Sequence, residues 1–212
     1  MVRLLATTAE TRWEGLLDAT VMQGKTPPAE ALRERDALTS PTVRAEVAAL
    51  YEEAFPPEER IDPTLLDELA GEPAVAFTAY YDGERFCGFS YSIDAGDYLY
   101  LLFLAVRGAE RSRGYGTRIL AQLKGQFPGR IIVLEVEPAD QSAPNAVQRR
   151  RRLAFYERNG FTPAGFDSIE GDMTYTLLKT PGPFDPAACT RAIVRAVKGR
   201  VPFGLVASPA TP

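Results

Sequence analysis

The sequence feature that most limits the fold is a nine-residue apolar segment leading directly into a loop rich in glycine and arginine. Every residue from Tyr98 to Val106 is aliphatic or aromatic, which predicts a central β-strand buried on both faces of a sheet. The loop runs to Thr117, and apolar residues at helical spacing follow it as far as Phe127. The pattern therefore predicts a buried strand, a tight turn and a helix in immediate succession.

The segments around this unit predict an α+β domain with a mixed central sheet flanked by helices. Hairpins lie on both sides of one strand–helix–strand crossover, an order typical of that class. The predicted helices are residues 41–54, a segment opened by Pro63, residues 114–127, a segment ending at Asn159-Gly160, and residues 186–198. The predicted strands are residues 74–81, 85–93, 98–106, 130–136, 162–168 and 173–179, with residues 2–6 as a further candidate.

The loop between strand and helix is suited to bind an anion. The first N–H groups of a helix lack an internal partner, the helix dipole makes that end positive, and glycine lets the backbone approach a ligand. Two nucleotide-binding loops do not fit: a Walker loop needs Gly-Lys-Ser/Thr where residues 115–118 read Tyr-Gly-Thr-Arg, and a dinucleotide fingerprint needs a glycine where Ile119 stands. On Gly114 and Gly116 alone, a glycine turn without a ligand is the alternative.

Composition excludes several classes of function. The chain has no histidine, which rules out Ser-His-Asp and Cys-His catalysis and histidine-based metal sites. Cys87 and Cys189 are far apart in sequence, so we expect two free thiols and no metal. The net charge of −4 gives no reason to expect a nucleic-acid partner. No apolar segment reaches the ~20 residues that span a bilayer, and no signal-peptide core is present, so we expect a cytoplasmic protein without a membrane partner.

Two motifs resemble those of the GCN5-related N-acetyltransferase (GNAT) superfamily. Arg111-x-x-Gly114-x-Gly116 follows a Leu-Ala-Val strand end, as in the family's Arg/Gln-x-x-Gly-x-Gly/Ala signature. Residues 155–161, FYERNGF, resemble the end of the helix that follows the family's next strand. The order and spacing agree, and the resemblance covers residues 41–180. It implies a GNAT-like fold, with residues 1–40 as an N-terminal extension and residues 181–212 as a C-terminal helix and tail.

The resemblance implies acetyl-coenzyme A as co-substrate and no metal. Main-chain groups at the end of the buried strand would bind the pantetheine arm, and backbone amides of the loop would hold the pyrophosphate. The residues so implied are Leu104, Ala105, Val106, Arg111, Ser112, Arg113, Gly114, Tyr115, Gly116 and Thr117. One departure is Arg149, which stands where the family often carries an asparagine, while the nearby Asn145 is out of register.

Glu135 and Tyr156 are the candidate catalytic residues. Without histidine, a carboxylate is the natural acceptor for the proton of an attacking amine. Glu135 stands in a buried-looking strand that would raise its pKa, and its Leu-Glu-Val context resembles family members whose glutamate takes this role. Tyr156 would protonate the departing thiolate. The alternatives are an ion-paired or solvent-facing glutamate and a core tyrosine.

Two charged segments carry open alternatives. Residues 149–152 are four consecutive arginines, which spread around a helix and form either a solvated or ion-paired face or a contact with the cofactor's ribose phosphate. Glu58-Glu59-Arg60 falls where the family often places its acceptor-binding loop, with plain surface charge as the alternative.

Together these features predict an acyltransferase that moves an acetyl group from acetyl-coenzyme A to an amine by direct attack in a ternary complex. A non-catalytic acyl-coenzyme A-binding sensor or interaction module is the alternative from another class, and a nucleic-acid-binding protein using residues 149–152 is a second. The acceptor, a small-molecule or peptide amine, stays open, as does a homodimer.

Overall fold

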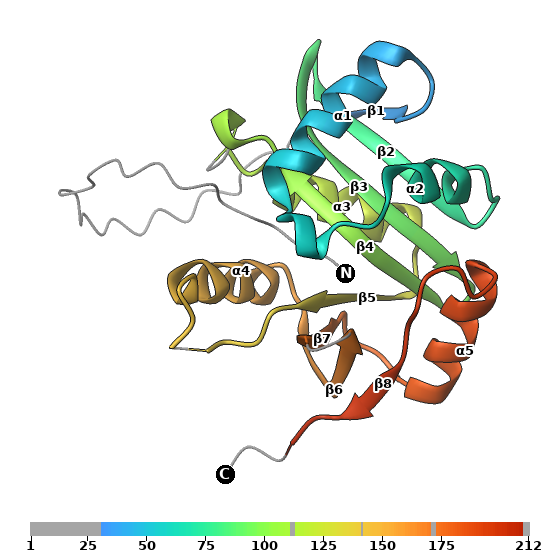
Figure 1. Ribbon diagram of the computed structural model, residues 1–212, viewed down its shortest axis with the longest axis vertical. Coiled ribbons are helices and arrows are strands. Elements are labelled where there is room, and N and C mark those ends of the chain that lie inside the picture. Colours follow the sequence, from blue (N-terminus) through green and yellow to red (C-terminus); the bar gives the residue numbers. More distant parts are fainter. Residues whose placement is uncertain (1–30, 111–112, 141, 171–172, 210–212) are drawn as a thin grey trace, which may run out of the picture.

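The computed structural model describes residues 31–110, 113–140, 142–170 and 173–209, which form an eight-stranded mixed sheet flanked by helices (Figure 1). The strand order is β1-β2-β3-β4-β5-β7-β6-β8, and only β4 and β5 pair in parallel. The strands are β1 (Arg33–Asp36), β2 (Val75–Asp82), β3 (Arg85–Ala95), β4 (Tyr98–Val106), β5 (Ile131–Val136), β6 (Thr162–Glu170), β7 (Met173–Lys179) and β8 (Leu205–Ala207). The predicted α+β class with a mixed sheet is confirmed.

Capping residues and prolines mark the start of three of the α-helices in the described residues. In the described ranges the helices are α1 (Pro41–Ala54), α2 (Pro63–Ala70), α3 (Tyr115–Gln126), α4 (Ala146–Arg158) and α5 (Pro186–Ala196), with the 3-10 helices η1 (Pro57–Glu59) and η2 (Gly108–Glu110). α1, α2 and α5 each open with proline after a capping side chain: Ser40, Asp62 and Asp185 respectively. Proline fits there because its missing N–H would have had no partner in the helix.

The sheet separates two apolar clusters. One cluster packs against α1, α2 and α5, and the other packs against α3 and α4. In Figure 1, α1 and α2 lie in front of the sheet and α3 behind it. All nine residues of β4 are buried, which confirms the predicted strand that is covered on both faces.

The folded unit includes elements on either side of residues 41–180. β1 pairs with β2 from Arg33↔Tyr81 to Asp36↔Thr78, and β8 pairs with β6. α5 buries Cys189 and Ile193, and its C-cap Val197 is buried beside them, in the cluster shared with α1 and α2. The C-terminal helix is therefore part of the core. The candidate strand at residues 2–6 lies outside the described residues.

Neither a membrane span nor a metal cluster is found in the described ranges. None of their helices is long and apolar enough to cross a bilayer. No three histidine, cysteine, aspartate or glutamate side chains within these ranges are grouped to hold a metal ion. Cys87 and Cys189 are free and buried, and burial raises the pKa of the Cys189 thiol to about 12, with the Glu135 and Asp185 carboxylates adding to the shift.

Candidate active site

The two central strands, β4 and β5, pair over a short stretch and then diverge. The parallel ladder joins residues 98–100 to residues 131–133. β4 continues to Val106, while β5 continues to Val136 along its other neighbour, β7. Figure 1 shows the two strands separating toward their C-terminal ends. Within the described chain, the β5-facing edge of β4 therefore has no strand partner beyond Tyr100.

A β-bulge in β4 changes which main-chain groups face that open edge. Tyr91 of β3 pairs with Phe103 and Ser92 pairs with Leu101, which leaves Leu102 as the extra residue. A bulge shifts the alternation of the strand by one position. The bulge lies two residues before the end predicted to bind the pantetheine arm.

The alternation after the bulge can be read from one hydrogen bond. The Arg107 N–H donates to the Cys87 carbonyl at 2.9 Å, so residue 107 faces β3. Bonded residues alternate along an antiparallel ladder, so Ala105 also bonds β3. The main-chain groups of Leu104 and Val106 consequently face the open edge. They are available to a ligand there, whereas those of Ala105 are committed to the sheet.

The N-terminus of α3 is open to an anion. Its N-cap, Gly114, has a left-handed backbone with φ of 77°, and a Cβ atom there would meet no other atom within 4 Å. Glycine has no side chain with which to cap the first N–H groups of the helix. The exposed Thr117 lies in the same first turn. Arg111 and Ser112 lie outside the described residues.

The other loop residues are tied to the protein itself. A Cβ atom at Gly116 would lie 2.9 Å from Phe155 Cζ, so this glycine allows α3 and α4 to pack closely. The Tyr115 hydroxyl donates to Asp82 Oδ2 at 2.7 Å and anchors α3 to the β2–β3 turn. Arg113 forms an ion pair with Glu110 at 3.5 Å. The side chains of Tyr115 and Arg113 therefore have structural partners, while their amides belong to the helix N-terminus.

Tyr156 on α4 has a buried hydroxyl with no hydrogen-bond partner in the described part of the chain. Burial raises the pKa of this phenol, and the nearby Arg152 guanidinium opposes the shift. The ring packs in the α3/α4 cluster together with Leu104, Val106 and Leu134. An orphaned buried hydroxyl costs about 1–3 kcal/mol, which is unusual in a core that has no use for it.

Glu135 on β5 is fully buried, and its Oε2 accepts a hydrogen bond from the Tyr100 hydroxyl at 2.6 Å. Its neighbours Ile132, Leu134 and Val136 face α3 and α4, and strand alternation places Glu135 on the opposite face with Val133. The expectation of a solvent-facing glutamate is thereby excluded. Tyr100 on β4 thus joins the two strands at the point where they begin to diverge.

Glu135 and Tyr156 lie on opposite faces of the sheet, on the two sides of the gap between β4 and β5. The sequence placed them on consecutive elements but could not place them relative to the gap. A thioester lying along the open edge of β4 would have a carboxylate toward one face of the sheet and a phenol toward the other. This arrangement suits a reaction in which one proton leaves and another is delivered at separate points.

The arginine run divides between two environments. Arg152 donates to Glu137 at 2.5 Å in a buried ion pair, and Arg149 reaches the same carboxylate at 3.0 Å. Asn145 also donates to Glu137, at 3.2 Å. Arg150 and Arg151 are exposed. The ion-paired alternative is therefore correct for two of the four side chains, and their contacts attach α4 to the end of β5.

Glu59 and Arg60 do not reach the cavity at Glu135. Arg60 donates to the main-chain oxygens of Phe55 at 2.6 Å and Glu52 at 2.7 Å, which caps the C-terminus of α1. Glu59 is buried. Glu59 is therefore not a surface charge and Arg60 has a structural role, while the side chain of Glu58 lies outside the described residues.

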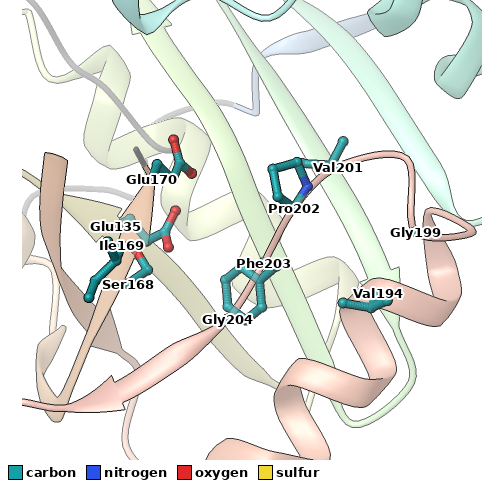
Figure 2. Close-up of a pocket in the computed structure, with 10 residues that line it drawn as sticks. All are labelled: Glu135, Ser168, Ile169, Glu170, Val194, Gly199, Val201, Pro202, Phe203 and Gly204. Atoms are coloured by element: carbon teal, nitrogen blue, oxygen red, sulfur yellow. The ribbon is translucent and has the colours of Figure 1, made fainter. Parts of the chain in front are cut away.

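A cavity of about 380 Å³ adjoins Glu135 on the face away from α4 (Figure 2). β6 contributes Ser168 and Glu170, and the segment from α5 to β8 contributes Val194, Val201 and Phe203. The Phe203 ring packs against the Tyr100 ring with centroids 4.9 Å apart. Sequence reasoning missed these residues and Tyr100, because only the fold brings residues 168–170 and 194–204 to Glu135.

Comparisons with known proteins identify the family of the chain. A family model described as the acetyltransferase (GNAT) family matches residues 41–161. A solved structure from Bacteroides thetaiotaomicron, described as an acetyltransferase of the GNAT family, is 27% identical with a TM-score of 0.63, covering 79% of this chain and 97% of its own. An aminoglycoside 6'-N-acetyltransferase complexed with coenzyme A is 20% identical with a TM-score of 0.56, covering 72% of this chain and 99% of its own.

A third similar structure is the ribosomal-protein-S18-alanine N-acetyltransferase from Escherichia coli. It is 17% identical with a TM-score of 0.53, covering 73% of this chain and 96% of its own. At these lower identities the likeness concerns the fold. A search of curated protein sequences gives no significant match.

Proposed function

Because this chain belongs to the acetyltransferase (GNAT) family, we propose that it transfers an acetyl group from acetyl-coenzyme A to an amine by direct attack within a ternary complex. The observation that carries the proposal is the gap between β4 and β5, with buried Glu135 on one face of the sheet and the unpartnered Tyr156 hydroxyl on the other. A non-catalytic binding module would need the phosphate loop but neither of these two groups.

The described residues fit the pyrophosphate and the pantetheine arm of coenzyme A. The uncapped N–H groups at the start of α3 and the open space at Gly114 suit the pyrophosphate. The open-edge main-chain groups of Leu104 and Val106 can pair with the pantetheine amides as a neighbouring strand would. When bound there, acetyl-coenzyme A supplies an activated acyl carbonyl and a thiolate leaving group.

Glu135 takes the proton that the attacking amine must lose. An amine near neutral pH is mostly protonated, and only its neutral form is nucleophilic. The Tyr100 hydroxyl donates to Oε2 and fixes the carboxylate in place. Glu135 takes one proton from the bound ammonium, directly or through a water, and the neutral amine then attacks. As the N–C bond forms and the C–S bond breaks, the nitrogen loses its second proton to water.

Tyr156 delivers a proton to the departing sulfur. Its raised pKa keeps the phenol protonated throughout the neutral range, and no group in the described chain competes for its O–H. Delivery of the proton leaves a free thiol. Main-chain N–H groups on the open edge of β4 stabilise the negative charge on the carbonyl oxygen, a role that their freedom from β3 supports.

The test is thiol release from acetyl-coenzyme A with a panel of amines, with mass spectrometry of the acetylated products. The proposal expects release that depends on the amine and falls in Glu135→Gln, most strongly at low pH, where deprotonation is hardest. Calorimetry measures acetyl-coenzyme A binding separately. Tight binding with no amine-dependent release would instead make the protein a binding module.

A further inference from the structure

The cavity beside Glu135 has a polar end that carries two acidic side chains. Glu135 and Glu170 both line it, and none of the described lining residues is basic. Figure 2 shows both carboxylates on the same side of the cavity, with Ser168 beneath them. This end of the cavity favours a positively charged group over an anion.

Ser168 adds an independent sign of a ligand. The residue is buried, and its Oγ has no hydrogen-bond partner in the described part of the chain. Buried hydroxyls are nearly always bonded, so one that lines a cavity without a protein partner indicates a group supplied from outside. An ammonium or amine N–H is a suitable donor to this oxygen.

The opposite wall of the cavity is apolar. Val194, Val201 and Phe203 form it, and Figure 2 places the Phe203 ring across the cavity from Glu135 and Ser168. Phe203 is itself held by the Tyr100 ring. All three belong to the segment from α5 to β8, which lies beyond the residues that match the family model. This wall is therefore a feature of this chain that the family match does not supply.

Resting on the acetyl transfer proposed above, we propose that this cavity binds the acceptor, and that the acceptor is a small cationic amine with an apolar body and no carboxylate. The ammonium group lies between Glu135, Glu170 and Ser168, and the carbon skeleton lies against Phe203. A substrate carboxylate is repelled by both acidic side chains. The volume of about 380 Å³ is at the small end for ligand pockets and suits a metabolite-sized amine.

Three probes of similar size separate the features of this ligand: phenethylamine, L-phenylalaninamide and L-phenylalanine. They are titrated by calorimetry into the full chain with coenzyme A present, so that no acetyl group is available. Phenethylamine and the amide should bind, with L-phenylalanine at least 10-fold weaker. Glu170→Gln should weaken phenethylamine by about 10-fold, the scale of losing one hydrogen bond to a charged group.

Matched variants test whether the amine affinity depends on the residues of this cavity. Glu157→Gln changes an exposed glutamate on α4 and should leave amine affinity unchanged. Phe203→Ala removes the apolar wall and should lower the affinity for phenethylamine. The larger 2-(1-naphthyl)ethylamine should gain affinity relative to phenethylamine in this variant. Circular dichroism checks that each variant is folded. Equal affinity for L-phenylalanine and its amide, failure of phenethylamine to bind, or a parent-like Glu170→Gln would overturn the proposal.

The outcomes also separate this proposal from the acetyl transfer itself. Thiol release with some other amine, while phenethylamine does not bind, refutes the cavity assignment and leaves the transfer intact. Phenethylamine binding that depends on Glu170, without thiol release from any amine, supports the cavity and refutes the transfer.

Discussion

A negative charge placed at Gly114 should weaken cofactor binding by at least about 100-fold without unfolding the protein. Gly114 is the N-cap of α3, its φ is 77°, and a side chain there would point into open space. Asparagine and aspartate are the side-chain-bearing residues that best tolerate a left-handed backbone, and they have nearly the same shape. Gly114→Asp therefore tests charge, and Gly114→Asn is its control for shape and backbone strain.

The magnitude follows from the position of the helix terminus. A carboxylate about 5 Å from one charge of the pyrophosphate costs about 3 kcal/mol at an effective dielectric constant of about 20. That energy corresponds to about a 100-fold increase in Kd for each phosphate charge that it opposes. Both variants share a backbone cost of about 1 kcal/mol, which cancels when they are compared with each other.

Calorimetric titration of acetyl-coenzyme A into both folded variants decides the matter. Gly114→Asn should bind with an affinity within about 10-fold of the parent's, because it adds no charge near the pyrophosphate and its backbone strain is present in both the free and the bound protein. Gly114→Asp should bind at least about 100-fold more weakly than Gly114→Asn. The difference should shrink as salt screens the partly exposed charge. If the two variants bind equally well, the pyrophosphate does not lie at the N-terminus of α3.

Three further predictions concern stability. Burial would raise the pKa of Glu137, but the Arg152 and Arg149 charges hold it below its ordinary 4.5. Glu137→Gln should therefore lose about 3–5 kcal/mol of stability above that pH, and the loss should shrink as pH falls through the lowered pKa. Urea titrations at several pH values measure the loss, and a loss that does not change with pH would contradict the ion pair. Gly116→Ala should lower stability by about 1–3 kcal/mol through the clash with Phe155. In a double-mutant cycle, Phe155→Leu should recover part of that loss, and additive effects would show that the two residues do not touch. Truncation after residue 185 should abolish cooperative thermal unfolding, because it removes the buried Ile193 of α5 and the buried C-cap Val197, worth about 1.5–3 kcal/mol each. A sharp parent-like transition would show that α5 is dispensable.

The sequence predicted the elements whose signals are local. The apolar run of β4, the glycine loop and the helix ending at Asn159-Gly160 each carry their pattern within about ten residues, and the structure has them where expected. β1 and β8 carry no such pattern. β1 reads Arg-Glu-Arg-Asp and β8 has three residues, so their strand character comes from main-chain pairing with β2 and β6.

The site was predictable only in part, because it too depends on contacts between segments that are far apart in the sequence. Strand alternation and helix position identified Glu135 and Tyr156 as candidates, but their placement on opposite faces depends on how β4 and β5 diverge. Glu135 is bonded to Tyr100, and Glu137 is paired with Arg149 and Arg152. No local sequence pattern links these residues. The second glycine of the loop was interpreted as a site of approach for an anion, which stays a prediction. The structure adds a packing reason for it, because a Cβ atom there would meet Phe155.

The most direct measurement of the central claim is the turnover number of Tyr156→Phe at saturating acetyl-coenzyme A with the best amine of the panel. The substitution removes only the hydroxyl, which bonds to nothing in the described chain, so folding and the calorimetric Kd for acetyl-coenzyme A should be unchanged. Tyr80→Phe is the control, because it removes a buried hydroxyl that is bonded to Ser90 at 2.9 Å away from the gap. The account predicts that kcat falls by about 10- to 1,000-fold in Tyr156→Phe alone, around the range for a general acid. Parent-like turnover across pH 6–9 in that variant would contradict it.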